Sequence, residues 1–348
     1  MVVEIRKQII VKLKKGESSM KVWTTSKKCF LLVILVLGFL GWSQGAQAQK
    51  YPTRTITLLC NNAPGAATDV GSRLIAQAAT KILGQEIIVV NKTGGGGSIG
   101  CAALVNSKPD GYTLLGTPGD QIILQPHLEP VGYDVKDFTP IIQFGVAPVG
   151  IVVRSDSPYQ SFKDLTDFAR KNPGKVSYGP PNFGTSPHLA MSIVMAKEKV
   201  DIAIIPFTGS TPALTAVLGG HVSACGVSTS SFIEHLKAGK VKALATTSPQ
   251  RIEAIPDAPT LSELGYPYCD GLEIIYMITA PKETPPDVVK LLEETFRKAM
   301  ESPEFLTYAK KTYSYVKNPL SGQDLKEALE KRSLNYKEIV QTANLGKK

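Results

Sequence analysis

Short apolar runs alternate with amphipathic segments along most of the chain. Thr55–Cys60 reads TITLLC and predicts a strand that ends at a turn signal rich in asparagine, proline and glycine. In the next segment, Asp69–Leu83, apolar residues recur at helical spacing, and Gly84 follows as a stop signal. Glu86–Val90 then predicts a second strand. This strand–turn–helix rhythm predicts an α/β fold with parallel strands.

The rhythm resumes after about residue 150, and the C-terminal part is helical. The further predicted strands are Tyr112–Leu115, Val176–Tyr178, Ala203–Pro206 and Val241–Thr246. The further predicted helices are one through residues 102–105, then Phe162–Lys171, His188–Glu198, Thr211–Leu218, Pro286–Met300, Pro303–Thr312 and Ser321–Thr342. Two long extended stretches, Ile141–Arg154 and Leu272–Ala280, have no helical partner. They predict two α/β lobes joined by two crossing strands, the second of which returns the chain to lobe one.

The N-terminal 48 residues have the three parts of a secretory signal peptide. A lysine-containing flank precedes the apolar run Phe30–Leu40, and a small-x-small site ends at Ala48. The apolar run is too short to span a bilayer comfortably, although an uncleaved membrane anchor is the alternative. We therefore predict export of the chain, with cleavage near Ala48. A start at Met20 would give a leader of more typical length.

Most of the excess charge lies in this leader. The whole chain has a formal charge of +9, but residues 1–48 hold eight of the 39 Lys and Arg residues and two of the 30 Asp and Glu residues. The remaining chain carries only +3, interspersed with acids, which does not indicate nucleic-acid binding. A composition of 43% hydrophobic and 20% charged residues also excludes a disordered chain.

Four cysteines follow the leader: Cys60, Cys101, Cys225 and Cys269. Export would place them where disulfides can form, but buried free thiols are the favoured interpretation. The chain has no C-x-x-C pair and no Cys/His cluster with zinc-like spacing. We therefore expect neither a metal nor another cofactor.

The turn Ala63–Asp69 joins a predicted strand to a predicted helix and consists mostly of small residues. Small residues let the backbone approach a ligand, and the first amides of a helix have no partner within the helix. Together with the helix dipole, these amides attract an anion without any arginine. Thr68 or Asp69 is the expected N-cap. An ordinary capped turn is the alternative.

A second turn of this design, Gly179–His188, follows a strand and precedes a helix in the second lobe. We expect Ser186 to be the N-cap and Pro187 to occupy the first helical position, where its missing N–H costs nothing. The turn is therefore a second candidate anion site, with a capped turn again as the alternative.

Two catalytic or cofactor patterns are present but weak. The run Gly94–Gly100 satisfies G-x-G-x-x-G and Asp120 lies twenty residues beyond it, yet four consecutive glycines match such a pattern easily. Ser186 and His188 are neighbours, and Asp69 could complete a hydrolytic triad. However, the chain has no G-x-S-x-G elbow, and a capping serine would have its hydroxyl committed.

An ordered set of motifs resembles the solute-binding receptors of tripartite tricarboxylate transporters, the TctC or Bug family. The motifs extend from about residue 51 to residue 341 and read YPTRTITLLCNNAPGAATD, NKTGGGGSIG, PDGYTLLGT, GTSPHLA, PFTGSTPALTAVLGGHV, AGKVKALATTSPQR and PDAPTLSELGYP. The resemblance implies a type II periplasmic binding protein with a ligand cleft between two α/β lobes. It implies lobe one over residues 49–149 and 275–348, and lobe two over residues 150–274.

The resemblance also implies the ligand and the partners. The solute would be a small carboxylate held by backbone amides of the first turn and by the facing turn, and the implied partners are one large and one small permease subunit. The implied contacts are Pro64, Gly65, Ala66, Ala67, Thr68, Asp69, Gly184, Thr185, Ser186, His188, Phe207 and Thr208. The glycine run becomes a loop near the cleft, and the default state is a monomer.

Departures from the family pattern bear on the solute. Many members have a lysine where this chain has Thr208, and an acid found in some members is missing near Ser223–Ser228. The missing acid favours a di- or tricarboxylate or an aromatic carboxylate over an amino acid. A ligand sensor for a signalling partner and an exported hydrolase that uses Ser186 and His188 remain the alternatives.

Overall fold

The computed structural model describes residues 51–269, 271–314 and 316–342. The predicted leader, its cleavage site and the alternative start at Met20 lie outside these residues. Pro52–Lys348 groups as one compact unit. Within the described ranges, no helix is long and apolar enough to cross a membrane.

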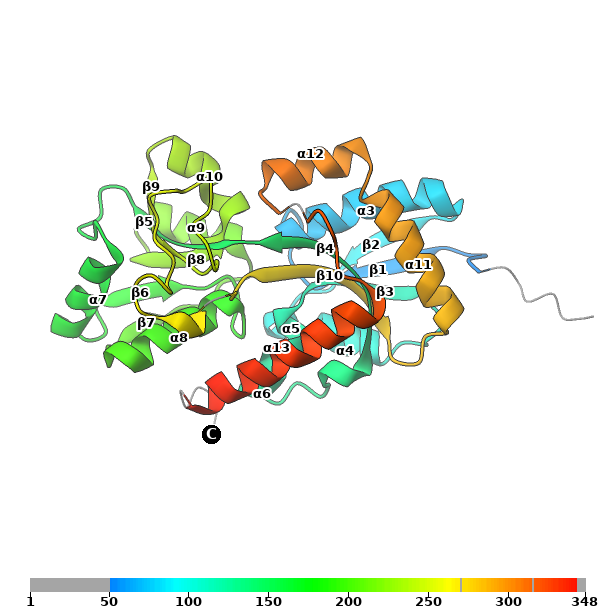
Figure 1. The fold of residues 1–348 in the computed structure, drawn as a ribbon, viewed down its shortest axis with the longest axis horizontal. Coiled ribbons are helices and arrows are strands. Elements are labelled where there is room, and N and C mark those ends of the chain that lie inside the picture. Colours follow the sequence, from blue (N-terminus) through cyan, green and yellow to red (C-terminus); the bar gives the residue numbers. More distant parts are fainter. Residues whose placement is uncertain (1–50, 270, 315, 343–348) are drawn as a thin grey trace, which may run out of the picture. The chain divides into compact units, whose positions relative to one another are not determined.

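Lobe one is built on a five-stranded mixed sheet with the order β2-β1-β3-β10-β4 (Figure 1). Strand β1 pairs in parallel with β2 and β3, whereas β10 runs antiparallel to β3 and β4. The strands are β1 (Ile56–Cys60), β2 (Ile87–Asn91), β3 (Thr113–Pro118), β4 (Phe138–Ala147) and β10 (Ile274–Pro281). The sheet therefore joins strands from both ends of the described chain.

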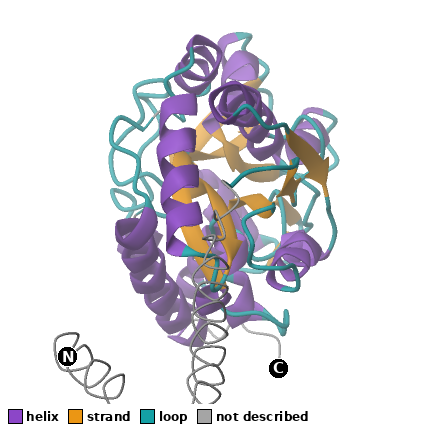
Figure 2. Ribbon diagram, turned by 90° about the vertical axis from the view of Figure 1, so that its right-hand side faces the viewer, coloured by secondary structure: helices purple, strands orange, loops and turns teal. Residues whose placement is uncertain are grey.

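Helices from both ends of the chain also belong to lobe one. They are α3 (Ala67–Leu83), α4 (Ser98–Val105), α5 (Asp120–Ile123), α6 (Gln125–Leu128), α11 (Pro286–Ala299), α12 (Pro303–Lys311) and α13 (Gly322–Thr342). Short 3-10 turns lie at η1 (Gly95–Gly97) and η2 (Val135–Asp137). In Figure 2 the helices (purple) lie outside the strands (orange), as expected for an α/β layer fold.

Lobe two has its own five-stranded sheet with the order β7-β6-β8-β5-β9. Its strands are β5 (Val149–Arg154), β6 (Val176–Gly179), β7 (Ile202–Ile204), β8 (Ala224–Ser228) and β9 (Val241–Thr246). Its helices are α7 (Phe162–Lys171), α8 (Ser186–Glu198), α9 (Ser210–Leu218) and α10 (Thr229–Lys237), with a 3-10 turn η3 (Pro267–Cys269). The predicted two-lobed α/β architecture is confirmed.

The crossings between the lobes differ from the prediction. Ile141–Arg154 is not one strand, because Pro148 separates β4 in the first sheet from β5 in the second. The Pro148 carbonyl accepts hydrogen bonds from the backbone and the hydroxyl of Thr229. The return crossing precedes Ile274, so β10 lies wholly in the sheet of lobe one. The first crossing is thus a single residue between two strands, whereas the return crossing follows η3 (Pro267–Cys269) in a long segment between β9 and β10.

The hydrophobic core is continuous across the two lobes. One cluster of buried side chains includes Leu115 of β3 in lobe one and Ile151 of β5 in lobe two. The four cysteines are buried free thiols. Burial raises the pKa of Cys60 to about 11, with Asn62 opposing the shift, and that of Cys101 to about 12. All four behave as small apolar residues.

Candidate functional site

A small cavity of about 40 Å³ lies between the two lobes. The N-terminal ends of α3, α8, α9 and α10 all contribute to its wall. Lobe one supplies Asn62, Ala66, Ala67, Thr68, Pro118, Asp120, Ile274 and Tyr276 to the lining, and lobe two supplies Pro181, Asn182, Thr185, Gly209, Ser210, Thr211 and Ser231. Of these lining residues, none is lysine, arginine or histidine.

Helix α3 presents its first amides to this cavity. Ala66 is the N-cap, in extended conformation and without a capping side chain. The Val70 amide donates to the Ala66 carbonyl at 2.9 Å. The amides of Ala67 and Thr68 precede that bond, so they have no acceptor within the helix. The prediction that Thr68 or Asp69 caps α3 is therefore wrong, and the uncapped start leaves these amides facing the cleft.

Asp69 does not line the cavity, and its carboxylate stabilises the turn before α3 by hydrogen bonds. Its carboxylate accepts from the Gly65 amide at 2.9 Å, from Asn91 Nδ2 at 2.7 Å and from Arg73 Nε at 3.0 Å. Burial raises the pKa of this carboxyl, but the bonds from Arg73, Gly65 and Asn91 outweigh it and hold the pKa below its usual value. Pro64, Gly65 and Asp69 are not among the lining residues. They shape the turn that presents the amides.

Helix α9 supplies a second set of amides that sequence reasoning missed. Its N-cap is Gly209 at φ 138°, a conformation that favours glycine. The Ala213 amide donates to the Gly209 carbonyl at 3.3 Å, so the amides of Ser210 and Thr211 precede the helical bonds. The strand–glycine–helix pattern of this segment could have indicated these free amides from the sequence. The predicted contacts lie next to it: Phe207 packs against Gly179, and Thr208 is exposed.

The N-terminus of α8 is already occupied by a carboxylate of the protein. Asp120 Oδ2 accepts from the Ser186 amide at 2.6 Å, and Asp120 Oδ1 accepts from Ser186 Oγ at 2.8 Å. The N-cap is Thr185, whose hydroxyl donates to the Asn182 carbonyl. The prediction that Ser186 is the N-cap is therefore wrong. Ser186 is the first residue of α8, and Pro187 follows it as the second.

The Asp120 carboxyl group is fully buried in this position. Asp120 is 1% exposed and Ser186 0%. Burial raises the pKa of Asp120, while the positive charge of Arg332 and the hydrogen bonds from Ser186 and Tyr336 oppose that rise. Asp120 thus places an acid at the cleft. It is distant in sequence from Ser223–Ser228, the segment in which an acid found in some family members is missing. Its place twenty residues after the glycine run had suggested a different, cofactor-related role.

The residues of the hypothetical hydrolase do not assemble. Ser186 Oγ bonds to Asp120, with Tyr336 Oη at 3.1 Å. The His188 ring packs on Phe183, with centroids 4.6 Å apart, and its Nδ1 has no hydrogen-bond partner in the described structure. Burial lowers the pKa of His188 to about 4, so the ring is neutral. Asp69 is committed elsewhere, and the catalytic interpretation fails on geometry.

The glycine run packs against lobe two. Gln125 Nε2 donates to the Gly95 carbonyl at 2.8 Å. A Cβ atom added to Gly96 would lie 2.9 Å from Gln125 Nε2 and 3.2 Å from the Phe183 carbonyl oxygen. The glycines at this point allow a close approach between the lobes. Gly184 faces Gln125 at the same contact.

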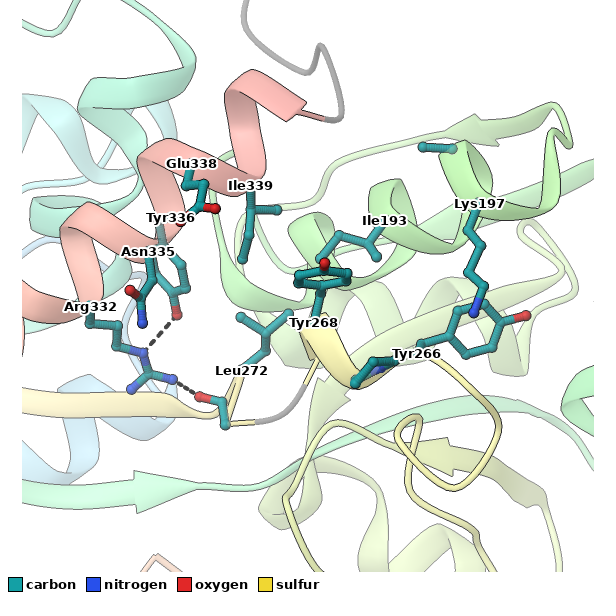
Figure 3. A pocket seen from close by; sticks show the side chains of 13 residues that line it. Ile193, Lys197, Tyr266, Tyr268, Leu272, Arg332, Asn335, Tyr336, Glu338 and Ile339 are labelled. Carbon is teal, nitrogen blue, oxygen red and sulfur yellow. Dashed lines mark hydrogen bonds between the residues drawn. The ribbon is translucent and has the colours of Figure 1, made fainter.

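A larger cavity of about 810 Å³ lies between the second half of α8, the segment around η3 and α13 (Figure 3). It is lined by aromatic and aliphatic side chains such as Tyr268 and Ile339. Lys197 Nζ bonds to the Gly265 carbonyl, and Arg332 Nη2 bonds to the Gly271 carbonyl. No α-helix begins among the lining residues of this cavity, so it lacks the α-helix N-termini found in the cleft.

Two α/β lobes and a cleft lined by helix N-termini are the architecture of a solute-binding protein. The chain belongs to the tripartite tricarboxylate transporter receptor family, TctC, whose sequence model matches residues 72–345. The family consists of solute-binding receptors and not of enzymes.

Known proteins resemble this chain over most of its length. A UPF0065 protein in the gbd 5' region of Cupriavidus necator is 35% identical over 270 residues, covering 77% of this chain and 81% of that protein. The periplasmic binding protein BugD is 30% identical with a TM-score of 0.79, covering 86% of this chain and all of BugD. MatC from Rhodopseudomonas palustris, solved with bound malate, is 25% identical with a TM-score of 0.78, covering 83% of this chain and all of MatC.

Proposed function

We propose that this receptor captures a small carboxylate in the interlobe cleft and delivers it to a tripartite transporter in the membrane. The observation that carries the proposal is the pairing of free helix amides on opposite walls of one cavity. Ala67 and Thr68 begin α3 in lobe one, and Ser210 and Thr211 begin α9 in lobe two. An anion placed between them would accept hydrogen bonds from both lobes.

The chemistry of the lining favours a carboxylate over a cation. Hydrogen bonds to a charged acceptor contribute about 1.5–3 kcal/mol each, and each helix dipole adds up to about 2 kcal/mol in a partly buried site. MatC, a structurally similar receptor, carries the dicarboxylate malate. A di- or tricarboxylate or an aromatic carboxylate therefore stays the proposed solute class.

Binding and closure are coupled in this proposal. The open protein captures the solute on one wall, and the second wall then closes over it. Only the closed state offers both sets of amides, so the solute shifts the equilibrium by its difference in affinity for the two states. The proposed contacts are the amides of Ala67, Thr68, Ser210 and Thr211. Pro64, Gly65 and Asp69 shape the first turn, and Gly184, Thr185, Ser186 and His188 shape the facing one.

The proposal also includes export of the chain and docking on membrane partners. We infer cleavage of residues 1–48 near Ala48 and a monomeric periplasmic protein. Its lobe one would comprise residues 49–149 and 275–348, and its lobe two residues 150–274. The closed form would dock on one large and one small permease subunit. Loss of uptake in cells that lack the receptor would separate this role from sensing, in which uptake continues.

A thermal-shift screen of the exported protein tests the binding proposal. A solute that binds only the folded state raises the melting temperature, and the shift grows with the logarithm of the ratio of solute concentration to dissociation constant. We expect a clear shift with one class of small carboxylates and none with the corresponding methyl esters. Equal shifts with acid and ester, or none with any carboxylate on a folded and ligand-free preparation, would contradict the proposal.

A further inference from the structure

A carboxylate of lobe one is bound to a helix of lobe two. Asp120 begins α5 in lobe one, and both of its oxygens accept hydrogen bonds from Ser186 at the start of α8. Asp120 borders the interlobe cavity, but the pair is almost completely excluded from solvent and both carboxylate oxygens are bonded to Ser186. Because the donors and the acceptor belong to different lobes, the lobes cannot separate without breaking both bonds.

The same serine leads into a chain of hydrogen bonds that ends at the return crossing. Ser186 Oγ lies 3.1 Å from Tyr336 Oη, and Arg332 Nε donates to Tyr336 Oη at 2.8 Å. Arg332 Nη2 donates to the carbonyl of Gly271 and, at 3.0 Å, to that of Glu273. Glu273 directly precedes β10. The interlobe bond and the crossing are therefore held by one network through α13.

We propose that Asp120 is a positioning residue for lobe closure. Its contact with Ser186, called the latch below, holds α8 against lobe one, and the amides of α3 and α9 stay available to the solute. This inference rests on the proposed function, because it requires a solute that binds the closed state. The carboxyl group of Asp120 takes the position at the α8 N-terminus that a bound anion would otherwise take.

A latch of this kind has a measurable signature. When only the closed state binds tightly, the apparent dissociation constant equals the intrinsic constant divided by the closed fraction. A residue that acts on closure alone therefore weakens every solute by the same factor. A residue that touches the solute weakens different solutes unequally.

The choice of substitutions follows from the two bonds. Asp120→Ala leaves the amide and hydroxyl of Ser186 buried without their acceptor, which is costly. Asp120→Asn can keep both contacts, since its Oδ1 can accept from the amide and its Nδ2 can donate to the hydroxyl oxygen. The charged and titratable groups that face Asp120 are Arg332 and Tyr336 from α13 and Tyr276 from β10. Asparagine removes the charge that burial disfavours, so we expect it to rescue the latch.

Isothermal titration of the exported protein with three carboxylates of different size, chosen from those that bind, tests the inference. We expect Asp120→Ala to weaken all three by the same factor, about tenfold. Asp120→Asn should stay within about threefold of the wild type. Asp110→Ala, at an exposed aspartate that pairs with Arg54, is the matched control and should change nothing. Circular dichroism confirms that each variant is folded.

Unequal losses among the three solutes, or unchanged affinities in Asp120→Ala, would overturn the latch. If Asp120→Ala does not fold, Ser186→Ala replaces it. That variant keeps the amide and loses only the hydroxyl, so the loss should again be equal for all solutes but smaller, about threefold, and unequal losses would again overturn the latch. A wild-type protein that binds no carboxylate would instead overturn the proposed function. The two failures are therefore distinguishable.

Discussion

The N-termini of α3 and α8 have the same design but different occupants. Each follows a strand and a glycine- and proline-containing turn, and each begins on the interlobe cavity. At α3, the nearby acid Asp69 is turned back to Gly65 and Arg73, so the first amides face the cleft. At α8, Asp120 from the other lobe accepts from the first amide.

The difference teaches that a helix N-terminus attracts an anion but does not specify its source. Backbone amides and the helix dipole are properties of local structure and are the same at both sites. Whether a side chain of the protein or a solute fills the position depends on what the tertiary fold brings there. A pair of similar turns can therefore divide into one binding site and one interlobe contact.

The largest expected effect comes from making α3 resemble α8. Ala66→Asp would place a carboxylate at an N-cap that has no capping side chain. It should cap the free amides, repel a carboxylate solute and lower its affinity about a hundredfold or more, equivalent to about 2.7 kcal/mol. Titration calorimetry measures the loss, and thermal unfolding should show equal or greater stability.

The matched control places the same charge on the same helix outside the cleft. Gln77→Asp adds an aspartate at an exposed position of α3 and should leave solute affinity within about twofold. If Ala66→Asp binds as well as the wild type, the amides of α3 do not hold the solute.

A smaller effect is expected at the amides of α9. Gly209→Ala would force a non-glycine residue to φ 138°, which costs about 1–3 kcal/mol of stability or shifts the turn. Misaligned amides at Ser210 and Thr211 should weaken binding about tenfold. Gly239→Ala, at φ 66° with open space around it, should lose stability and keep its affinity. Equal affinities in the two variants would show that α9 takes no part in binding.

The smallest effect on affinity is expected at the acid that braces the α3 turn. Asp69→Asn should destabilise the protein by about 1 kcal/mol at pH 7, because charge-assisted bonds to Gly65, Arg73 and Asn91 become neutral and Arg73 is half-exposed. Partners hold the folded-state pKa of Asp69 below its usual value. Its stabilising effect is therefore present at neutral pH and is lost as the pH falls through that pKa.

Denaturant unfolding of the wild type and Asp69→Asn across pH 3–7 measures this dependence. The difference between them should shrink toward the acidic end of this range, as the pH approaches the lowered pKa of the wild-type carboxyl. A constant difference over the whole range would contradict the assigned role. Asp110→Asn, at an exposed ion pair, is the control with little expected change at any pH.

Local patterns predicted most of the regular elements. The predicted bounds of α7 and β9 agree with the structure, because α7 has a capping box between Ser161 and Asp164 and β9 is flanked by turn signals. Strand β8 (ACGVS) and helix α10 were missed. Strand β8 is short and contains glycine and cysteine in place of a clear β-branched run. Pro148 separates β4 from β5, but the continuous apolar pattern of this segment predicted a single extended stretch.

The site was predictable only in part, for the same physical reason. The turn before α3 is a local feature, and its small residues are enough to indicate exposed amides. The Asp120–Ser186 contact joins residues that are 66 positions apart and lie in different lobes. No spacing rule specifies such a contact, because it depends on how the lobes pack. The predicted cap at Ser186 was wrong by one position, because Thr185 has the extended backbone of an N-cap and Ser186 is already helical.

A crystal structure of the exported protein with a bound carboxylate tests the central claim most directly. The account predicts a carboxylate oxygen within hydrogen-bond distance of the amides of Ala67 or Thr68, with the other wall of the site formed by Ser210 and Thr211. Asp120 should still accept from Ser186. A solute carboxylate on the Ser186 amide with Asp120 displaced, or one paired with a lysine or arginine side chain, would contradict it.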